Sequence, residues 1–191
     1  ECHNAKEVTD SILTLRSQKH PFLLMGFGSN ILASDKGVDL FMIRYTSSTP
    51  LVKNIDSATQ NIAEIEVDAA TQLDDLVIHA IENGLNGLTV FSGIPGTLGG
   101  AITGNAGAYG QQISDLLKTI TLLRSDNSII TVDRSAIRFE YRDSELKHTD
   151  NIVLSATLQL PKTGNINEMR AQRAATIATR EQKHGRWQKT P

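Results

Sequence analysis

The sequence lacks several features that mark specialised classes of protein. Cys2 is the only cysteine among 191 residues, so an intramolecular disulfide and a cysteine metal cluster are both excluded. No apolar run approaches the ~18 residues that a membrane span requires, and the segment from Glu1 to Lys6 does not read as a secretory signal. The formal net charge of -2 offers no electrostatic footprint for nucleic acid. We therefore expect a cytoplasmic protein with neither a nucleic-acid nor a membrane partner.

Aromatic and histidine residues are also few. One tryptophan and three tyrosines argue against stacking on nucleic-acid bases, and the five histidines show no ligand spacing, so we expect no metal site. A hydrophobic content of 39% is that of an ordinary globular chain. The length allows one sizeable domain or two small lobes, and we expect a monomer.

Hydrophobic periodicity predicts helices and strands in mixed order. Helices are expected at 5–18, 72–83 and 165–184, with a helical turn at 113–117. Strands are expected at 21–25, 38–43, 51–55, 62–67, 117–123, 128–132 and 152–160, of which 117–123 and 128–132 form a hairpin. Thr71 is the predicted N-cap of the second helix, and Gly84 closes it. The third helix has a weak apolar face, mainly alanine with Met169 and Ile177. Without strict alternation of strand and helix, the fold class is α+β.

Most of the 14 glycines fall in two loops. The first loop, 26–30, reads Gly-Phe-Gly-Ser-Asn, and the second, 93–101, continues into 105–110. Glycine permits positive φ and close backbone approach, so such loops can turn their N–H groups toward a pyrophosphate. Two such loops imply one extended ligand, for which a dinucleotide cofactor is the natural candidate. The alternative is that the glycines only mark tight turns. That alternative does not explain why the second loop and its continuation are so long and carry so little charge.

The loops match neither common nucleotide fingerprint. A P-loop is excluded because neither reads G-x-x-x-x-G-K-[ST]. The first loop begins like the G-x-G-x-x-G dinucleotide motif, but Ile31 stands where the third glycine belongs. The residues after it, 33–37, read as a turn and not as a helix.

Four motifs in one order carry a resemblance to a known family. They are G-x-G-S-N at 26–30, G-I-P-G-x-x-G-G-A at 93–101, N-A-G-A-Y-G at 105–110 and Y-R-x-S-x-x-K at 141–147. In this order and spacing the chain resembles the UDP-N-acetylenolpyruvoylglucosamine reductases (UDP-N-acetylmuramate dehydrogenases) of bacterial peptidoglycan synthesis. The resemblance covers roughly residues 5–185.

The resemblance implies a two-lobed FAD-binding module of the vanillyl-alcohol-oxidase / PCMH type. Lobe 1 is expected at 1–50 and lobe 2 at 51–162, followed by a C-terminal helix at 163–191 that leads toward a substrate domain. The implied reaction is reduction of the enolpyruvyl UDP-sugar, with NADPH as reductant. Because neither loop contains His or Cys, the FAD is expected to be non-covalent. The implied cofactor-binding residues are Gly26, Phe27, Gly28, Ser29, Asn30, Ile31, Gly93, Ile94, Pro95, Gly96, Gly99, Gly100, Ala101, Asn105, Gly107, Ala108 and Tyr109.

The fourth motif supplies the catalytic candidate. By resemblance, Arg142 stabilises the charge that develops on the substrate carboxylate, and Tyr141 contacts the substrate; a fixed guanidinium suits this role because it donates bidentate hydrogen bonds. The alternative for Arg142 is a surface ion pair with Asp143 or Glu145. For Ser144 and Lys147, helix capping and a solvated charge are adequate explanations.

The resemblance leaves two functional residues unassigned. The family's substrate domain, which begins near Pro191, carries a serine that protonates the intermediate and an assisting glutamate, and neither has a counterpart here. The alternatives are therefore a piece of the full enzyme, a short relative that binds FAD without the full reaction, or another flavin oxidase or dehydrogenase of this fold.

Overall fold

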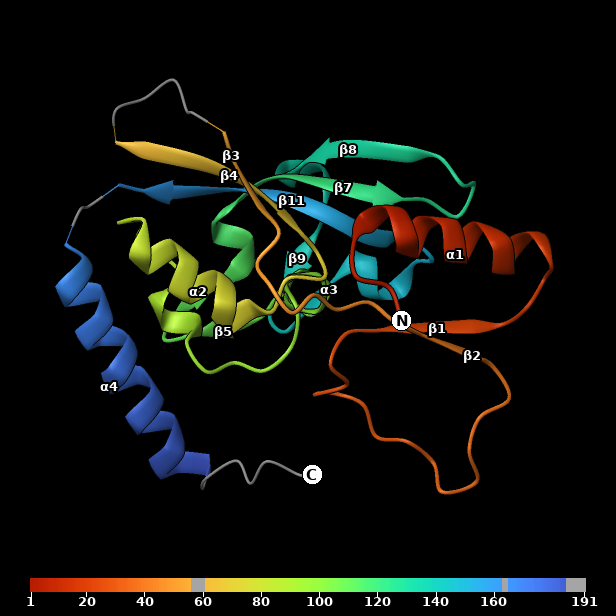
Figure 1. The fold of residues 1–191 in the computed structure, drawn as a ribbon, viewed down its shortest axis with the longest axis horizontal. Helices are drawn as coiled ribbons and strands as arrows, with labels where there is room; N and C mark the ends of the chain where they lie inside the picture. Colours follow the sequence, from red (N-terminus) through yellow and green to blue (C-terminus); the bar gives the residue numbers. More distant parts are fainter. Residues whose placement is uncertain (56–60, 163–164, 185–191) are drawn as a thin grey trace.

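A five-stranded antiparallel sheet forms the centre of the molecule (Figure 1). The computed structural model describes residues 1–55, 61–162 and 165–184. The strand order is β3 (Val52–Ile55), β4 (Ile62–Asp68), β11 (Ile152–Pro161), β7 (Leu117–Leu123) and β8 (Ile129–Asp133). All five strands, including the β7–β8 hairpin, lie where the alternating pattern predicts them, although β11 includes Pro161.

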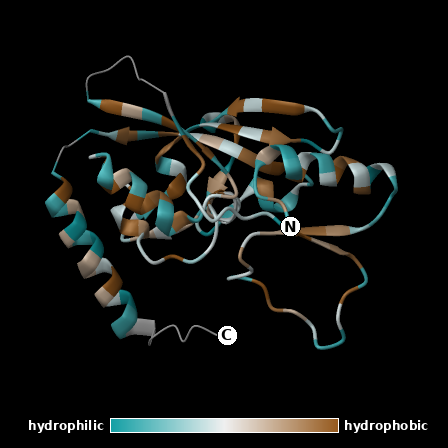
Figure 2. Ribbon diagram, viewed as in Figure 1, coloured by the Kyte–Doolittle hydropathy of each residue, from teal (hydrophilic) through white to brown (hydrophobic). Residues whose placement is uncertain are grey.

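Two amphipathic helices supply much of the core beneath this sheet. Helix α1 (Ala5–Ser17) buries Val8 and Ile12 completely, and Asn4 caps it by accepting the Glu7 N–H. Helix α2 (Leu73–Glu82) buries Leu73, Leu76, Val77 and Ala80 in the same core as the inward residues of β4. Figure 2 shows hydrophobic residues gathered on the strands and on α2. Burial of these faces is what holds the elements together.

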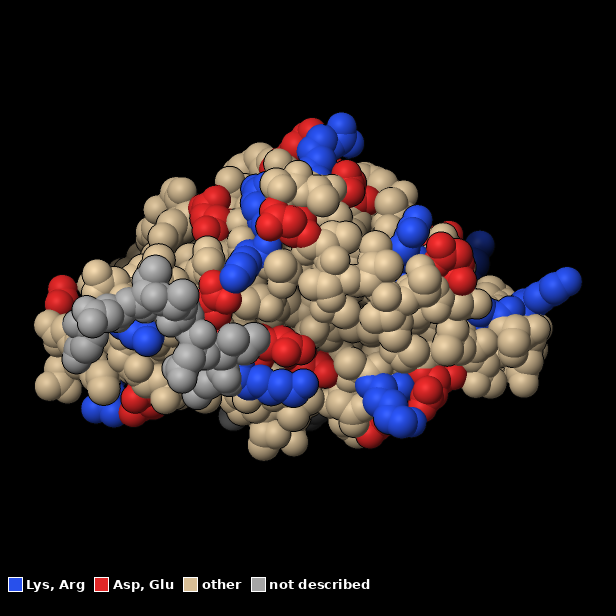
Figure 3. Space-filling model, turned by 90° about the horizontal axis from the view of Figure 1, so that it is seen from above, with Lys and Arg blue, Asp and Glu red and all other residues tan. Residues whose placement is uncertain are grey.

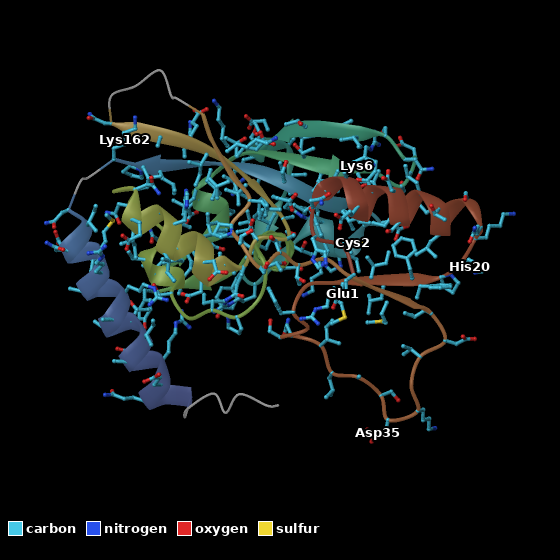
Figure 4. The ribbon with its side chains drawn as sticks, viewed as in Figure 1. Glu1, Cys2, Lys6, His20, Asp35 and Lys162 are labelled. Atoms are coloured by element: carbon cyan, nitrogen blue, oxygen red, sulfur yellow. The ribbon has the colours of Figure 1, made fainter. Side chains whose placement is uncertain are left out.

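A separate two-stranded sheet lies on the far side of α1. Strand β1 (Phe22–Met25) pairs in parallel with β2 (Phe41–Arg44), beginning at Phe22 opposite Phe41. The prediction that β2 begins at residue 38 is wrong by three residues, because the four residues of β1 pair only with 41–44 and Val38 stays exposed. The chain between the two strands loops away from the body, with Asp35 near its tip (Figure 4).

The prediction that Thr71 caps α2 is also wrong. Gln72 occupies the N-cap position and makes no side-chain capping bond. The Thr71 hydroxyl instead accepts the Leu51 N–H at 3.2 Å, which joins the entry of β3 to the entry of α2. At the other end Gly84 follows the C-cap with φ +68°, as a closing glycine should.

The second glycine loop contains a helix that the sequence analysis does not predict. Helix α3 (Leu98–Thr103) forms where glycine-rich sequence argued for a loop. Glycine disfavours helix interiors, but here Leu98 and Ile102 are fully buried and Thr97 caps the helix by accepting the Gly100 N–H at 3.3 Å. The predicted helical turn at 113–117 is a 3-10 turn, η2 (Ile113–Asp115).

The last described helix, α4 (Ile166–His184), runs alongside α2 and is largely hydrophilic (Figures 1 and 2). Its weak apolar face agrees with the prediction, since Met169 is buried and Ile177 only half-buried. None of the helices in the described residues is both long and apolar enough to cross a membrane. On the face seen in Figure 3, acidic and basic side chains are interspersed.

Candidate functional site

The two glycine loops and the Arg142 segment line one cavity of about 1260 Å³. This volume exceeds the roughly 300–1,000 Å³ of ordinary small-molecule sites, which fits a large, extended ligand. The predicted residues that line it are Gly26, Phe27, Gly28, Ser29, Asn30, Ile31, Ile94, Pro95, Gly96, Gly99, Gly100, Ala101 and Arg142. The chain folds so that segments far apart in sequence face the same space.

The first loop follows β1 and lines the cavity. None of the N–H groups from Gly26 to Asn30 donates to an acceptor within the part of the chain that the structure describes; only Ile31, the next residue, does, to the Gly28 carbonyl at 3.2 Å. A Cβ on Gly26 would lie 2.8 Å from Thr97 Oγ1, so the two loops approach too closely there for any side chain. The loop contains neither lysine nor arginine, so these donors are neutral.

The second loop is held by its backbone against α2 and the turn that follows β4. The Leu73 N–H donates to the Gly96 carbonyl at 3.0 Å, and the Gly99 N–H donates to the Ala69 carbonyl at 3.0 Å. These bonds leave the N–H groups of Gly96 and Thr97 without an acceptor among the described residues. The loop therefore adds two donors to those of the first loop.

A hydrogen bond joins the two loops directly. The Ser29 hydroxyl donates to the Pro95 carbonyl at 3.2 Å. Gly96 has φ +122°, a conformation open almost only to glycine, and a Cβ there would lie 3.2 Å from Ser29 Oγ. The predicted pairing of the loops around one space is thus present in the geometry.

Arg142 occupies the turn of a short hairpin between β9 (Phe139–Glu140) and β10 (Asp143–Ser144). It has φ +58° and lines the cavity, whereas the neighbouring Tyr141 is 86% exposed and does not line it. The hairpin is anchored by the Ser144 hydroxyl, which donates to the Thr103 carbonyl of α3 at 2.7 Å. Ser144 is buried and occupies the N-cap position of η4 (Glu145–His148), but its side chain makes no capping bond there, so the hydroxyl serves as an anchor to α3.

The carboxylate beside Arg142 is engaged elsewhere. Asp143 lies 2.8 Å from His148 Nε2 and 3.7 Å from Lys147 Nζ. The hydrogen bond with His148 is the main reason why the pKa of Asp143 is lowered. Among the described residues, Arg142 forms no ion pair with Asp143 or Glu145, so the surface ion-pair alternative has no support in the geometry.

Six predicted residues do not line the cavity. Asn105 is buried and donates to Gln112 Oε1 at 2.6 Å and to the Glu140 carbonyl at 2.7 Å, which ties the third motif to the residue that precedes the fourth. Tyr109 is exposed, with the Arg180 guanidinium 5.9 Å from its ring centre. The six are Gly93, Asn105, Gly107, Ala108, Tyr109 and Tyr141.

One wall of the cavity is formed by residues that the sequence analysis does not predict. Arg16, from the last turn of α1, donates to the Arg124 carbonyl at 2.6 Å, to Asn127 Oδ1 at 3.0 Å and to the Asp150 carbonyl at 3.0 Å. His20 also lines the cavity, with its ring 5.1 Å from that of Phe41. No motif marks these residues, because only the folded topology brings them together. The described residues contain no cluster of three potential metal ligands.

Comparison with known proteins agrees with this geometry. The family model described as "FAD binding domain" matches residues 1–133. The UDP-N-acetylenolpyruvoylglucosamine reductase of Caldanaerobacter subterraneus subsp. tengcongensis is 37% identical over 164 residues, covering 86% of this chain and 52% of that protein. The protein of the same name from Enterococcus faecalis is 35% identical over 178 residues, covering 93% and 57%. The chain thus spans about half the length of the curated relatives it matches.

Solved structures show the fold. The crystal structure of UDP-N-acetylenolpyruvylglucosamine reductase from Thermus caldophilus aligns with a TM-score of 0.72 at 27% identity, covering 94% of this chain and 61% of that one. A solvent-stable cholesterol oxidase aligns with a TM-score of 0.63 at 17% identity, covering 83% and 33%, which speaks for the fold alone. The predicted α+β FAD-binding module of the vanillyl-alcohol-oxidase / PCMH type is confirmed.

Proposed function

This chain belongs to the family of FAD-binding domains, and we propose that it is the FAD-binding part of a UDP-N-acetylenolpyruvoylglucosamine reductase. One observation carries the proposal: two glycine loops, joined by the Ser29–Pro95 hydrogen bond, line a single cavity and contain backbone N–H groups that have no acceptor among the described residues. Neutral N–H groups in such an array bind phosphate oxygens well. The names of the relatives supply the reaction type.

The residues present fit a dinucleotide. The N–H groups from Gly26 to Asn30 and those of Gly96 and Thr97 would hold the pyrophosphate, with the Ser29 and Asn30 side chains adding hydrogen bonds. The small residues Gly100 and Ala101 leave room for a flat ring against α3, while Gly99 allows the loop to pack closely on Ala69. No His or Cys lies within either loop, so the cofactor is held without a covalent bond. We retain Gly93, Asn105, Gly107, Ala108 and Tyr109 as outer binding residues, which position the loops.

Arg142 is the proposed catalytic residue. When bound, the flavin would accept a hydride from NADPH and deliver it to the enolpyruvyl double bond. Arg142 would meet the substrate carboxylate with its guanidinium and stabilise the negative charge that builds there, while Tyr141 contacts the substrate. The engagement of Asp143 by His148 and Lys147 supports this role, because it leaves the guanidinium without a neutralising carboxylate beside it.

The wider assignment follows from the same proposal. The substrate is a UDP-sugar, the product UDP-N-acetylmuramate, the pathway peptidoglycan synthesis and the compartment the cytoplasm, where the protein acts as a monomer. We propose that lobe 1 comprises 1–50, lobe 2 comprises 51–162, and 163–191 leads toward the substrate domain. Since the chain spans about half of its relatives, a second candidate function is FAD binding without the full reaction.

Anaerobic reduction and reoxidation test the proposal. The FAD-loaded protein, including the chain that follows Pro191, should be reduced by NADPH and reoxidised by the enolpyruvyl UDP-sugar. If the reduced flavin were reoxidised only after oxygen was admitted, the result would contradict the reductase assignment and indicate an oxidase of the same fold. Stable FAD binding with no reduction by NADPH would indicate the second candidate, a binding module.

A further inference from the structure

The second glycine loop is anchored from outside the cavity by a carboxylate. Asp74, in the first turn of α2, accepts the Gly93 N–H through Oδ1 at 2.8 Å. Its other oxygen, Oδ2, accepts a hydrogen bond from Arg173 Nη2 of α4 at 2.5 Å. Both side chains are mostly buried, with 23% of Asp74 and 24% of Arg173 exposed. One carboxylate therefore links α4, α2 and the start of the loop.

Helix α4 also packs against Gly93. A Cβ built on Gly93 would lie 3.6 Å from Arg180 Cδ and 3.7 Å from Ile177 Cγ1. The Arg180 guanidinium donates to the Val90 carbonyl at 3.3 Å, within η1 (Thr89–Phe91). The chain that enters the loop is thus confined between α2 and α4, which lie side by side in Figure 1.

The anchor lies three residues from the proposed phosphate donors. Gly93 does not line the cavity, but Ile94, Pro95 and Gly96 do. Leu73, the residue before Asp74, holds the Gly96 carbonyl through its N–H. The first turn of α2 therefore binds the loop at two places: the Asp74 side chain accepts the Gly93 N–H, and the Leu73 N–H donates to the Gly96 carbonyl. The direction of the Gly96 and Thr97 N–H groups depends on these two bonds.

We propose that Asp74 is a positioning residue for the cofactor loop, and that Arg173 of α4 fixes its carboxylate in the orientation that holds Gly93. A carboxylate suits this position because both oxygens accept at once, one from the backbone and one from the guanidinium. An asparagine has one acceptor and would turn its NH₂ group toward one of the two donors. This inference rests on the proposed binding of FAD.

Two variants and a matched control test the inference. Asp74→Asn removes the double acceptor and Arg173→Gln releases the carboxylate, whereas Glu82→Gln breaks the exposed Arg170–Glu82 pair between the same two helices without touching the loop. The measurements are the Kd for FAD, the visible circular dichroism of the bound flavin, and amide hydrogen exchange at Gly93 without FAD. We expect Asp74→Asn to weaken FAD binding about tenfold, change the flavin spectrum and accelerate Gly93 exchange. Arg173→Gln should act in the same direction, and Glu82→Gln should resemble the wild type.

The outcomes separate the inference from the proposed function. Wild-type affinity, spectrum and Gly93 exchange in both Asp74→Asn and Arg173→Gln would overturn the role of Asp74 while leaving FAD binding intact. An equal loss in Glu82→Gln would also overturn it, because the effect would then belong to helix packing in general. If the wild type bound no FAD, the proposed function would fail, and Gly93 exchange would still decide whether Asp74 holds the loop.

Discussion

Ser29 and Pro95, which lie 66 residues apart in the chain, are joined by a 3.2 Å hydrogen bond from the serine hydroxyl to the proline carbonyl. The bond connects the loop that follows β1 with the loop that precedes α3. A ligand that fills the cavity between them can therefore contact both loops. Because two loops from different parts of the fold form one surface, changes in either should appear in cofactor affinity.

Ser29→Ala removes this bond and a proposed side-chain donor to the pyrophosphate. We expect FAD binding to weaken about fivefold, since one net hydrogen bond contributes about 1 kcal/mol. The melting temperature of the apoprotein should hardly change because Ser29 is exposed. Ser34→Ala, in the same excursion between β1 and β2, is the control. Equal Kd values for the two variants would count against the role of Ser29.

Gly96→Ala tests the close approach of the loops. The added Cβ meets Ser29 Oγ at 3.2 Å at φ +122°, so the loop must move. We expect FAD affinity to fall at least tenfold, together with some loss of stability. Gly37→Ala is the matched control: it also has positive φ (+72°), but its Cβ would have open space. Gly37→Ala should lose roughly 1–2 kcal/mol of stability and keep its FAD affinity.

Arg142→Ala should affect turnover far more than folding. Loss of an electrostatic group at the developing charge typically costs ~10²–10³ in rate. The variant should keep its FAD and its melting temperature, and Arg142→Lys should recover only part of the rate, because an ammonium lacks the planar fork. The assay is reoxidation of the reduced protein, including the chain that follows Pro191, by the enolpyruvyl UDP-sugar. Arg138→Ala, in the same hairpin and paired with Glu140, is the control.

Two outcomes would refute this role for Arg142. If Arg142→Ala unfolded or lost its flavin while retaining its rate per folded molecule, the arginine would be structural. If Arg138→Ala slowed reoxidation as much, the effect would belong to the charge of the hairpin as a whole.

Tyr45→Phe should destabilise the joint between the end of β2 and the central sheet. Tyr45 is buried, and its hydroxyl contacts Asp68 Oδ1 and the Leu154 carbonyl, at 2.5 and 3.1 Å. Removing the hydroxyl from buried acceptors should cost about 1–3 kcal/mol of unfolding free energy at pH 7, measured by urea denaturation. A variant as stable as the wild type would contradict this account of the joint.

The same tyrosine predicts a dependence of stability on pH. Burial, followed by the nearby Asp68, raises the pKa of Tyr45 above its ordinary value of 10.0. The unfolded chain then loses this proton first as the pH rises. The contribution of Tyr45 is therefore complete below about pH 10 and is lost above it, by up to about 1.4 kcal/mol per pH unit. The wild type should lose more stability than Tyr45→Phe between pH 9 and 11, on the order of that slope; parallel curves would contradict the prediction.

The sequence predicts those parts of the fold that depend on local patterns. The stripe of α2 and the alternation of β4 and β11 are buried as their periodicity requires. Helix α3 could not be foreseen, because its glycines oppose a helix and only the burial of Leu98 and Ile102 overrides them. Thr71 is a residue type that often caps helices, but its hydroxyl accepts the N–H of Leu51, the residue before β3.

The residues of the site also fall into those that local motifs predict and those that only the folded chain brings together. Motifs predict the residues 26–31, 94–96 and 99–101 of the two glycine loops and Arg142, which do line one cavity, but also six residues that do not. The wall made by Arg16 and His20 depends on how α1 meets the β7–β8 hairpin, a long-range relationship that no local motif encodes. Asn105 combines the two cases. A motif predicts it as a binding residue, but its hydrogen bonds to Gln112 and Glu140 show that it holds other parts of the chain in place.

The binding of FAD by the purified chain tests the central claim most directly. The account predicts a yellow protein with flavin absorption bands, from which denaturation releases unmodified FAD, and an apoprotein that regains the bands when FAD is added. A colourless protein that fails to bind added FAD would contradict it.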